Sequence, residues 1–469
     1  MKIQVLRAVR MQFRLMICPH LPPHPIFFPP AHLLIFNPRE MNKWLLPFCF
    51  SLFLNALDGE RIRRIGKLDS QTWEQHISLG QNQGSYLPSE DFPDLGTVGV
   101  LRSDSGFLGT ATLIAPNLIV TAAHVVKNSL MDPNPEDENW QFILSSDFEQ
   151  ATITESFEVS NFVIHPAWTI RQNDGINNGN GDGDRIGVDL CLAFLKEKVL
   201  EMYPMPLPNG NFASIGEQVI IAGYGTRVDG LNGVINSNNS NRLAGENILD
   251  RVVEQISIPS LSNQYWGGVL AVDFDSPQQN TNFLGEEYPS IDYLGTGKSD
   301  ANPLPLEVST AVGDSGGPVL TNFEGRWRIN GVVSYGTNYS LYGDVTVFTR
   351  LASHQEWINQ YLPAWNEAKI LQGGSWRELN WFGAFLPYDQ GWNFHSQFGW
   401  FFTADPKGSS FWSWHPTIGW SWLSSGVFPF LYSDEQKNWF YLDLKSSNPE
   451  KWLIYDYSIA SWEIIMKVL

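Results

Sequence analysis

The 469-residue sequence has little cysteine and a deficit of basic side chains, and after its first sixty residues it has no long apolar segment. Two of its three cysteines, Cys18 and Cys49, fall in a segment that we expect to be absent from the mature protein. The third, Cys191, lies in an apolar run and is expected to be a buried thiol, so the predicted fold has no disulfide. The net charge of -19 disfavours a nucleic-acid partner, because phosphates would be repelled. No later segment could form a transmembrane helix.

The segment at 41–59 has the pattern of a signal peptide. Lys43 supplies a short positive region, the apolar stretch Trp44–Leu57 follows, and small residues come after it. This stretch is too short to span a bilayer; a buried helix is the alternative. The Pro-rich start before it fits neither pattern, so we expect translation to begin at Met41. The prediction is an exported protein, either secreted, periplasmic or held at the cell surface.

Most of the remaining sequence predicts an all-β fold. Short runs rich in Val, Ile, Leu and Thr alternate with turn clusters, and only 351–362 has helical spacing. The last part differs, because it holds 11 of the 19 tryptophans and repeats phrases such as GWNF and GWSW. The expected organisation is a start with signal peptide at 1–59, a lead segment at 60–91, a main β domain at 92–363, a linker at 364–374 and an aromatic β module at 375–469.

Three phrases in the main β domain carry chemistry. His124 stands in TAAHV after a strand-like run, Asp189 heads the apolar run DLCLAFL, and Ser315 stands in GDSGGP. A serine hydroxyl needs an adjacent base to become a nucleophile, and histidine titrates in the right range. A buried carboxylate orients the imidazole and stabilises its charged form. Each phrase alone has an ordinary structural explanation, but all three in this order predict a nucleophile, a general base and an orienting acid.

These phrases, with VVSYG at 332–336 and VFTRLASHQEWI at 347–358, resemble the bacterial trypsin/chymotrypsin family of serine proteases over about 92–363. The resemblance implies two six-stranded antiparallel Greek-key β-barrels, with the aromatic module after them. It implies a secreted serine endopeptidase with a Ser-His-Asp triad, acting on protein or peptide substrates. The loops are longer than usual and the family's disulfides are missing. Its activated N-terminus is not clear, with 64–66 the nearest candidate.

The resemblance also assigns residues around the triad. The backbone N–H groups of Gly313 and Ser315 would form the oxyanion hole, with Asp314 organising their loop. The substrate backbone would pair with the segment at 334–336, and the side chain before the cut bond would enter a pocket. No acid is expected at the pocket base, so we predict an uncharged preference there. The substrate-binding residues implied are Ser309, Ser334, Tyr335, Gly336 and Thr346.

Two regions leave alternatives open. Asn178, Asn180, Asp182 and Asp184 alternate with glycines, a pattern that would suit a structural Ca²⁺, although a plain solvated loop is the competing interpretation. No other cofactor is expected. The aromatic module resembles Gly-Trp repeat modules of exported bacterial enzymes. Its rings would stack on a glycan or a cell-surface ligand, or fill the module's own core. The alternative function is a cell-surface or polysaccharide-binding protein on a protease scaffold.

Overall fold

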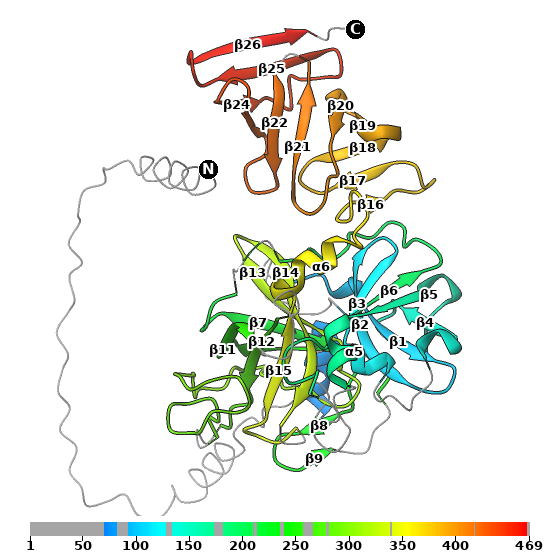
Figure 1. Ribbon diagram of the computed structural model, residues 1–469, viewed down its shortest axis with the longest axis vertical. Helices are drawn as coiled ribbons and strands as arrows, with labels where there is room; N and C mark the ends of the chain where they lie inside the picture. The colour runs from blue at the N-terminus through cyan, green and yellow to red at the C-terminus, as the bar shows by residue number, and fades with distance from the viewer. Residues whose placement is uncertain are drawn as a thin grey trace, which may run out of the picture. The chain divides into compact units, whose positions relative to one another are not determined.

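The structure is a computed structural model of the whole chain. It describes residues 70–81, 92–127, 134–172, 182–208, 210, 213–234, 239–256, 266–277, 281–337, 340–416 and 418–466. The predicted signal peptide and start site therefore lie outside the described residues. Among the described helices, none is long and apolar enough to cross a membrane. The architecture is mostly β (Figure 1).

The first β layer is a closed six-stranded antiparallel barrel with the strand order β1-β2-β3-β6-β5-β4. Alternate positions rich in Val, Leu and Ile bury their side chains inside it. Cys191 opens β6, is fully buried and is a free thiol, and burial raises its pKa. The strands are β1 Val98–Ser103, β2 Leu108–Ala115, β3 Leu118–Thr121, β4 Trp140–Ile143, β5 Ser156–Ile164 and β6 Cys191–Leu195.

The second layer is a seven-stranded sheet with the order β10-β7-β13-β14-β15-β12-β11, whereas a closed six-stranded barrel was expected. A short turn joins its two edge strands, so the sheet curls back on itself. At the gap, Asn247 donates from its side chain to the carbonyl of Asp273 (3.0 Å), in place of a strand ladder. The strands are β7 Gln218–Gly223, β10 Leu243–Ile248, β11 Arg251–Ile256, β12 Gly267–Asp273, β13 Pro318–Phe323, β14 Arg326–Gly336 and β15 Val345–Arg350; a separate two-stranded ribbon pairs β8 Val228–Asp229 with β9 Gly233–Val234.

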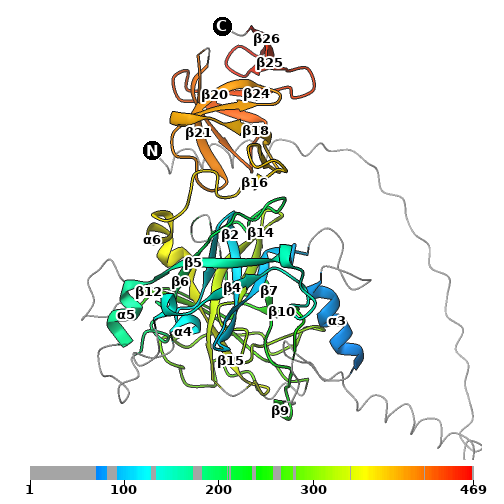
Figure 2. The ribbon, with the colours of Figure 1, turned by 90° about the vertical axis from the view of Figure 1, so that its right-hand side faces the viewer.

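Helices are few and short (Figure 2). The first, α3 Ser70–Gly80, comes from the predicted lead segment and packs on β10, where His76 Nδ1 lies 2.8 Å from the Ala244 carbonyl. The helix expected at 351–362 is shorter, with a 3₁₀ turn before one α-helical turn. The elements are α3, α4 Ala123–Val126, α5 Pro166–Gln172 and α6 Gln355–Asn359, with 3₁₀ turns η2 Leu95–Thr97, η3 Pro135–Asp137, η4 Ile153–Glu155, η7 Leu351–His354 and η8 Asp389–Gly391.

The C-terminal module is one 11-stranded antiparallel meander in which the strands follow chain order. It begins before 375, because β16 pairs with β17 and Trp365 packs in the module's core, so part of the predicted linker belongs to the module. The strands are β16 Lys369–Ile370, β17 Arg377–Leu379, β18 Gly383–Pro387, β19 Trp392–His395, β20 Gly399–Thr403, β21 Ser410–His415, β22 Gly419–Ser424, β23 Phe430–Ser433, β24 Asn438–Leu442, β25 Lys451–Asp456 and β26 Ser461–Met466.

The two faces of this sheet differ. One face closes a core that includes Phe385, Phe401 and Phe440, all at most 3% exposed. The other face carries half-buried or exposed rings in three cross-strand rows. The rows are Trp392–Phe402–Trp414–Trp420, Trp412–Trp422–Tyr432–Trp439 and Phe430–Tyr441–Tyr455–Trp462.

Candidate active site

The first barrel supplies two neighbouring functional side chains. β3 ends at Thr121 and β6 begins at Cys191, and these two residues are direct antiparallel partners. His124, in the helical turn α4 just after β3, and Asp189, just before β6, therefore emerge at the same end of the barrel. The buried Asp189 carboxylate also accepts the backbone N–H of His124 (3.0 Å), which fixes the turn against it.

The second sheet supplies Ser315, in the loop before β13. Gly313 and Gly316 flank it with φ of +101° and +79°, a backbone conformation that favours glycine. A Cβ at Gly316 would lie 2.1 Å from the Thr121 hydroxyl. Thr110 on β2 ties this loop to the first barrel, because its N–H donates to the Ser315 carbonyl (2.8 Å) and its hydroxyl to the Gly313 carbonyl (2.8 Å).

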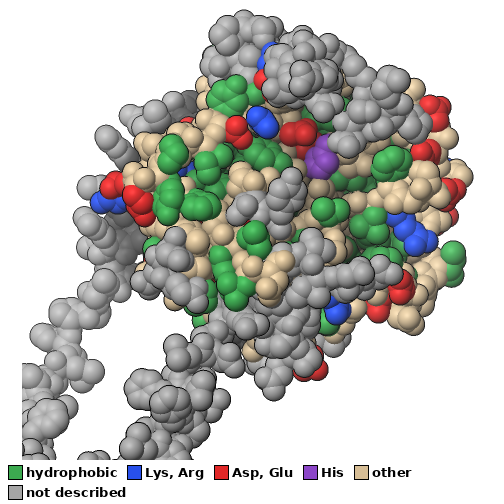
Figure 3. Space-filling view, turned by 90° about the horizontal axis from the view of Figure 1, so that it is seen from below, with side chains coloured by type: hydrophobic (Ala, Val, Ile, Leu, Met, Phe, Trp, Pro, Cys, Tyr) green, Lys and Arg blue, Asp and Glu red, His purple; other side chains and the backbone are tan. Residues whose placement is uncertain are grey.

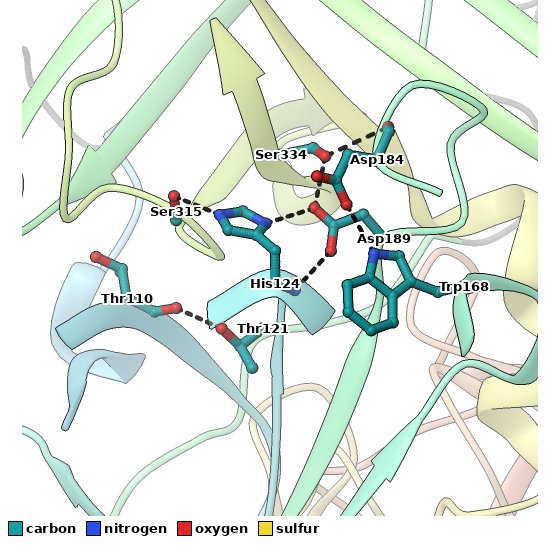
Figure 4. A network of polar contacts seen from close by, with 8 residues as sticks. All are labelled: Thr110, Thr121, His124, Trp168, Asp184, Asp189, Ser315 and Ser334. Carbon is teal, nitrogen blue, oxygen red and sulfur yellow. Dashed lines mark hydrogen bonds and ion pairs between the residues drawn. The ribbon is translucent and has the colours of Figure 1, made fainter. Parts of the chain in front are cut away.

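The three predicted side chains form one hydrogen-bonded chain (Figure 4). Ser315 Oγ lies 2.8 Å from His124 Nε2, and His124 Nδ1 lies 2.7 Å from Asp189 Oδ2. Ser334 on β14 donates to the same Asp189 oxygen (2.6 Å). The arrangement can pass a proton from the serine hydroxyl to the imidazole while a buried carboxylate holds the ring.

The environment of His124 favours its protonated form. Burial alone would lower the pKa of His124, but the charge and hydrogen bond of Asp189 and the charge of Asp184 outweigh it and raise the pKa to about 9. The imidazolium is thus stabilised by carboxylates. On the face seen in Figure 3, a histidine lies directly beside acidic side chains.

The backbone N–H groups of Gly313 and Ser315 are the predicted donors of the oxyanion hole. Within the described residues, neither group donates to a protein acceptor. The neighbouring carboxylate of Asp314 is buried and accepts the N–H groups of Gly225 (2.7 Å) and Ala311 (2.8 Å), which holds the loop in shape. A Cβ at Gly225 would lie 2.1 Å from that carboxylate, so this close approach requires glycine.

The segment Ser334–Gly336 has an open edge. β13 begins at Pro318, opposite Val332. Among the described strands, β14 beyond Val333 is therefore paired only with β15, on its other side. Tyr335 is held by its hydroxyl, which donates to Asp292 (2.9 Å). An unpaired strand edge beside a nucleophile can accept an extended chain as an added strand.

The predicted base of the substrate pocket is a buried cluster of hydroxyls with one carboxylate. Ser309 Oγ lies 2.8 Å from Thr346 Oγ1, and both side chains are fully buried. Asp344 is two residues before Thr346 and on the same side of the extended chain, and its carboxylate accepts the Ser309 hydroxyl at 3.5 Å. The absence of an acid at the base of the substrate pocket stays a prediction, and Asp344 is a carboxylate beside Ser309 at a position that the resemblance does not mark.

The predicted calcium loop is described only in part, and calcium binding stays a prediction. Asn178 and Asn180 lie outside the described residues. Asp182 forms an ion pair with Arg171, which already supplies a positive charge, and Asp184 accepts the indole N–H of Trp168 (2.7 Å). One ligand atom from each of His124, Asp184 and Asp189 lies within 4.8 Å of the other two, but hydrogen bonds within the site already engage all three.

Sequence reasoning missed four residues that shape this site. Thr110 and Trp168 act through contacts between segments distant in sequence, and no local pattern marks them. Asp184 was considered only as a calcium ligand. Asp344 could have been found from strand alternation, because it and Thr346 are two residues apart at the start of β15 and so face the same side.

Comparisons with known proteins find similarities for part of the chain. The family model described as Trypsin matches residues 93–253. The chain is similar to spermosin of Halocynthia roretzi (21% identity; 54% of each chain) and to vitamin K-dependent protein C of Rattus norvegicus (23%; 44% of this chain and 36% of that protein). A shorter stretch is similar to chymotrypsin-C of Bos taurus (43%; 12% of this chain and 22% of that protein).

These matches cover at most about half of the length of the curated relatives. Residues 93–253 therefore correspond to a trypsin-type domain, and the closed six-stranded barrel in this part of the chain agrees with that match.

Proposed function

We propose that this protein is a serine endopeptidase that cleaves peptide bonds through an acyl-enzyme intermediate. The observation that carries the proposal is the unbroken hydrogen-bonded chain from Ser315 through His124 to Asp189. His124 and Asp189 lie in the part of the chain, 93–253, that matches the Trypsin family model. The three side chains come from two different β layers, and the buried Asp189 carboxylate accepts a hydrogen bond from the imidazole.

In the proposed reaction, Ser315 Oγ attacks the carbonyl carbon of the scissile bond while His124 Nε2 takes the hydroxyl proton. The resulting oxyanion accepts hydrogen bonds from the N–H groups of Gly313 and Ser315. Each of these donors contributes about 2.7–4 kcal/mol of transition-state stabilisation. The imidazolium then gives its proton to the leaving amine. A water molecule, deprotonated by the same imidazole, hydrolyses the ester and regenerates the serine.

Substrate selection at the cut bond follows from the buried cluster beneath β14. A side chain that ends in a hydrogen-bond donor would form a charge-assisted hydrogen bond with the Asp344 carboxylate, and an apolar side chain would not. In place of the uncharged preference predicted from the sequence, we therefore propose a preference for a side chain that ends in such a donor, with Lys and Arg preferred. A peptide library should show this preference, and Asp344→Asn should weaken it; an apolar preference in both proteins would reject it.

An active-site probe tests the enzyme itself. The full chain should react with a fluorophosphonate, and Ser315→Ala should abolish the labelling because the only activated hydroxyl is lost. Ser160→Ala is the matched control, since Ser160 lies exposed on β5 and donates only to the Phe194 carbonyl. If the wild-type protein in its mature form takes no label, the proposal of an active protease fails.

We also propose that the protein is exported through the segment at 41–59. Trypsin-like relatives and the signal-peptide pattern support this localisation. N-terminal sequencing of protein recovered outside the cell should begin between roughly residues 57 and 65, where such a signal would be removed. A mature protein that still carries residue 1 would contradict both the export route and the start at Met41.

The aromatic module supports a second role, binding of a neutral glycan. Its three cross-strand rows are built entirely of Trp, Tyr and Phe, and none of the twelve positions carries a charge although the whole chain has a net charge of -19. Flat rings with polar N–H and O–H edges suit ligands that offer both C–H faces and hydroxyls.

Retention of the Ser315→Ala chain on insoluble neutral polysaccharides tests this role without self-cleavage. Binding should weaken when Trp412 and Trp422 are both changed to Ala, because one row then loses two of its four rings. Equal retention of both proteins, or retention of neither, would assign the rows to stability alone.

A further inference from the structure

We propose that Asp184 is a positioning residue of the catalytic centre: a second carboxylate beside His124 that stabilises the imidazolium formed when Ser315 loses its proton. This inference rests on the proposed function. It adds a feature to the hydrogen-bonded chain Ser315–His124–Asp189, here called the relay. That feature is a pair of carboxylates beside one imidazole. Asp184 reaches this place from the loop that precedes Asp189 (Figure 4).

The geometry places Asp184 within direct electrostatic range of the relay. One side-chain nitrogen or carboxylate oxygen from each of Asp184, His124 and Asp189 lies within 4.8 Å of the other two. At such a distance an opposite charge shifts a pKa by about one unit or more. Asp189 already accepts three hydrogen bonds, from the His124 backbone, the His124 ring and Ser334. Asp184 thus adds a second negative charge beside His124, next to an Asp189 carboxylate that already accepts three hydrogen bonds.

Asp184 is held in place by a dedicated partner. The indole N–H of Trp168, on α5, donates to its carboxylate at 2.7 Å, and Trp168 is only 2% exposed. A Cβ at Gly183 would lie 2.8 Å from the same indole, so the chain must pass the ring closely. The carboxylate is therefore fixed toward the relay by packing as well as by charge.

The loop around Asp184 is anchored on both sides. Before it, Asp182 pairs with Arg171 of α5. After it, the Gly187 carbonyl accepts His354 Nε2–H at 2.7 Å. His354 Nδ1 in turn lies 3.2 Å from His165 Nε2. The anchors make the position of Asp184 a property of the fold.

Every charged or titratable group that faces Asp184 has a defined effect. Burial and the negative charge of Asp189 raise the pKa of Asp184 to about 6, while His124, the Trp168 hydrogen bond and Arg185 act in the opposite direction. Arg185 is mostly exposed and lies 3.8 Å from Asp292. On β14, burial and Asp292 raise the pKa of Tyr335, which stays neutral. Burial and Asp189 thus oppose the charged form of Asp184, whereas a protonated His124 favours it.

Two carboxylates have opposite effects on two steps. They make the imidazole harder to deprotonate in the free enzyme, so fewer molecules carry the neutral base at pH 7. They also stabilise the imidazolium in the transition state, so each productive complex reacts faster. Removing the Asp184 charge should therefore move the acidic limb of kcat/KM to lower pH by about one unit and reduce the plateau kcat several-fold.

The test compares Asp184→Asn with wild type through the pH profile of kcat/KM and through NMR titration of the His124 ring. The titration is done in Ser315→Ala, so it needs no activity. The pKa of His124 should fall in Asp184→Asn. Asp182→Asn is the matched control, because it loosens the same loop without removing the charge near the ring and should leave the His124 pKa in place. Trp168→Phe should give a smaller shift than Asp184→Asn.

The outcomes separate the two proposals. A labelled wild-type protein whose pH profile and His124 titration are identical in Asp184→Asn would overturn the inference and leave the protease intact. An equal shift in Asp182→Asn would also overturn it, because the effect would then come from loop structure. A wild-type protein that takes no label, while its His124 pKa still depends on Asp184, would reject the protease and keep the electrostatic pairing.

Discussion

The two β layers at 92–363, here called the trypsin domain, and the aromatic module are both β structures with apolar cores, but the trypsin domain also buries several carboxylates. The trypsin domain places ionisable groups such as Asp189, Asp250 and Asp275 inside, each at most 6% exposed. The module's core is built of rings and aliphatic side chains, and its other face repeats aromatic rows. Specific chemistry is therefore concentrated in a few polar residues of one region, while the other distributes similar contacts over many rings.

The difference predicts how each region responds to change. A buried polar group depends on particular partners, so one substitution has a large and specific effect. A repeated aromatic face has many equivalent contacts, so one substitution has a small effect. The following experiments test this contrast.

The largest effect is expected for Asp189→Asn. The amide cannot accept all three hydrogen bonds that the carboxylate receives, and it does not stabilise the imidazolium. We expect kcat to fall by about 10⁴-fold, measured on a peptide ester with the label uptake as a second readout. Asp182→Asn should retain most activity. Equal activity in Asp189→Asn and wild type would remove Asp189 from the relay.

The next effect concerns the module's core. Phe411 on β21 is 5% exposed and its ring lies against Trp365 and Phe382, with centroids 5.0 and 5.4 Å away. Phe411→Ala should cost the module about 3–5 kcal/mol of unfolding free energy, measured by tryptophan fluorescence in urea. Peptidase activity should persist in the same samples before the module unfolds. An unchanged transition would show that this face is not the core.

A pH-dependent effect is expected in the trypsin domain. Burial, and then the negative charges of Asp273 and Glu307, raise the pKa of Asp275 to about 9. The folded state thus holds a proton that the unfolded state releases above its lower, ordinary pKa. Between these two values stability falls as pH rises, by up to about 1.4 kcal/mol per pH unit for one such group.

Asp275→Asn removes this proton exchange. The variant should melt above wild type at pH 8, and the difference should shrink as pH falls toward 4, as measured by calorimetry with an inhibitor bound. Asp434→Asn, on the exposed surface of the module, should leave the pH dependence unchanged. A variant less stable than wild type at pH 8 would contradict the raised pKa.

The sequence allowed the barrels' strands and the relay to be anticipated because both depend on local patterns. The mostly apolar run at 111–114 and the Gly-rich phrase around Ser315 encode a strand and a tight loop directly. The position of Asp344 beside Ser309 depends on how β15 meets the nucleophile loop, which spacing alone does not reveal. The presence of a seventh strand, β11, likewise depends on how the sheet edge curls, which local spacing does not reveal.

The aromatic phrases in the last quarter of the chain predicted strands but not their assembly. Alternation showed that rings such as Trp420 and Trp422 share a face. It could not tell which face closes the core, because both faces are aromatic. Phe411 and Trp412 are adjacent aromatic residues, but Phe411 is buried and Trp412 is exposed. The sheet's continuity from β16 onward depends on pairing across turns, which repeat length does not specify.

The smallest effect is expected on the open face. Trp412 is 41% exposed and pairs across strands with Trp422. Trp412→Ala should cost only about 0.2–1 kcal/mol, because its cross-strand contacts are partial and its neighbours in the row remain. The comparison with Phe411→Ala is internal, since the two residues are consecutive on β21 and point to opposite faces. Equal losses in urea unfolding would mean that both faces are core and that the rows are covered in the folded protein. A small loss together with weaker polysaccharide retention would mean that the open face contributes more to binding than to stability.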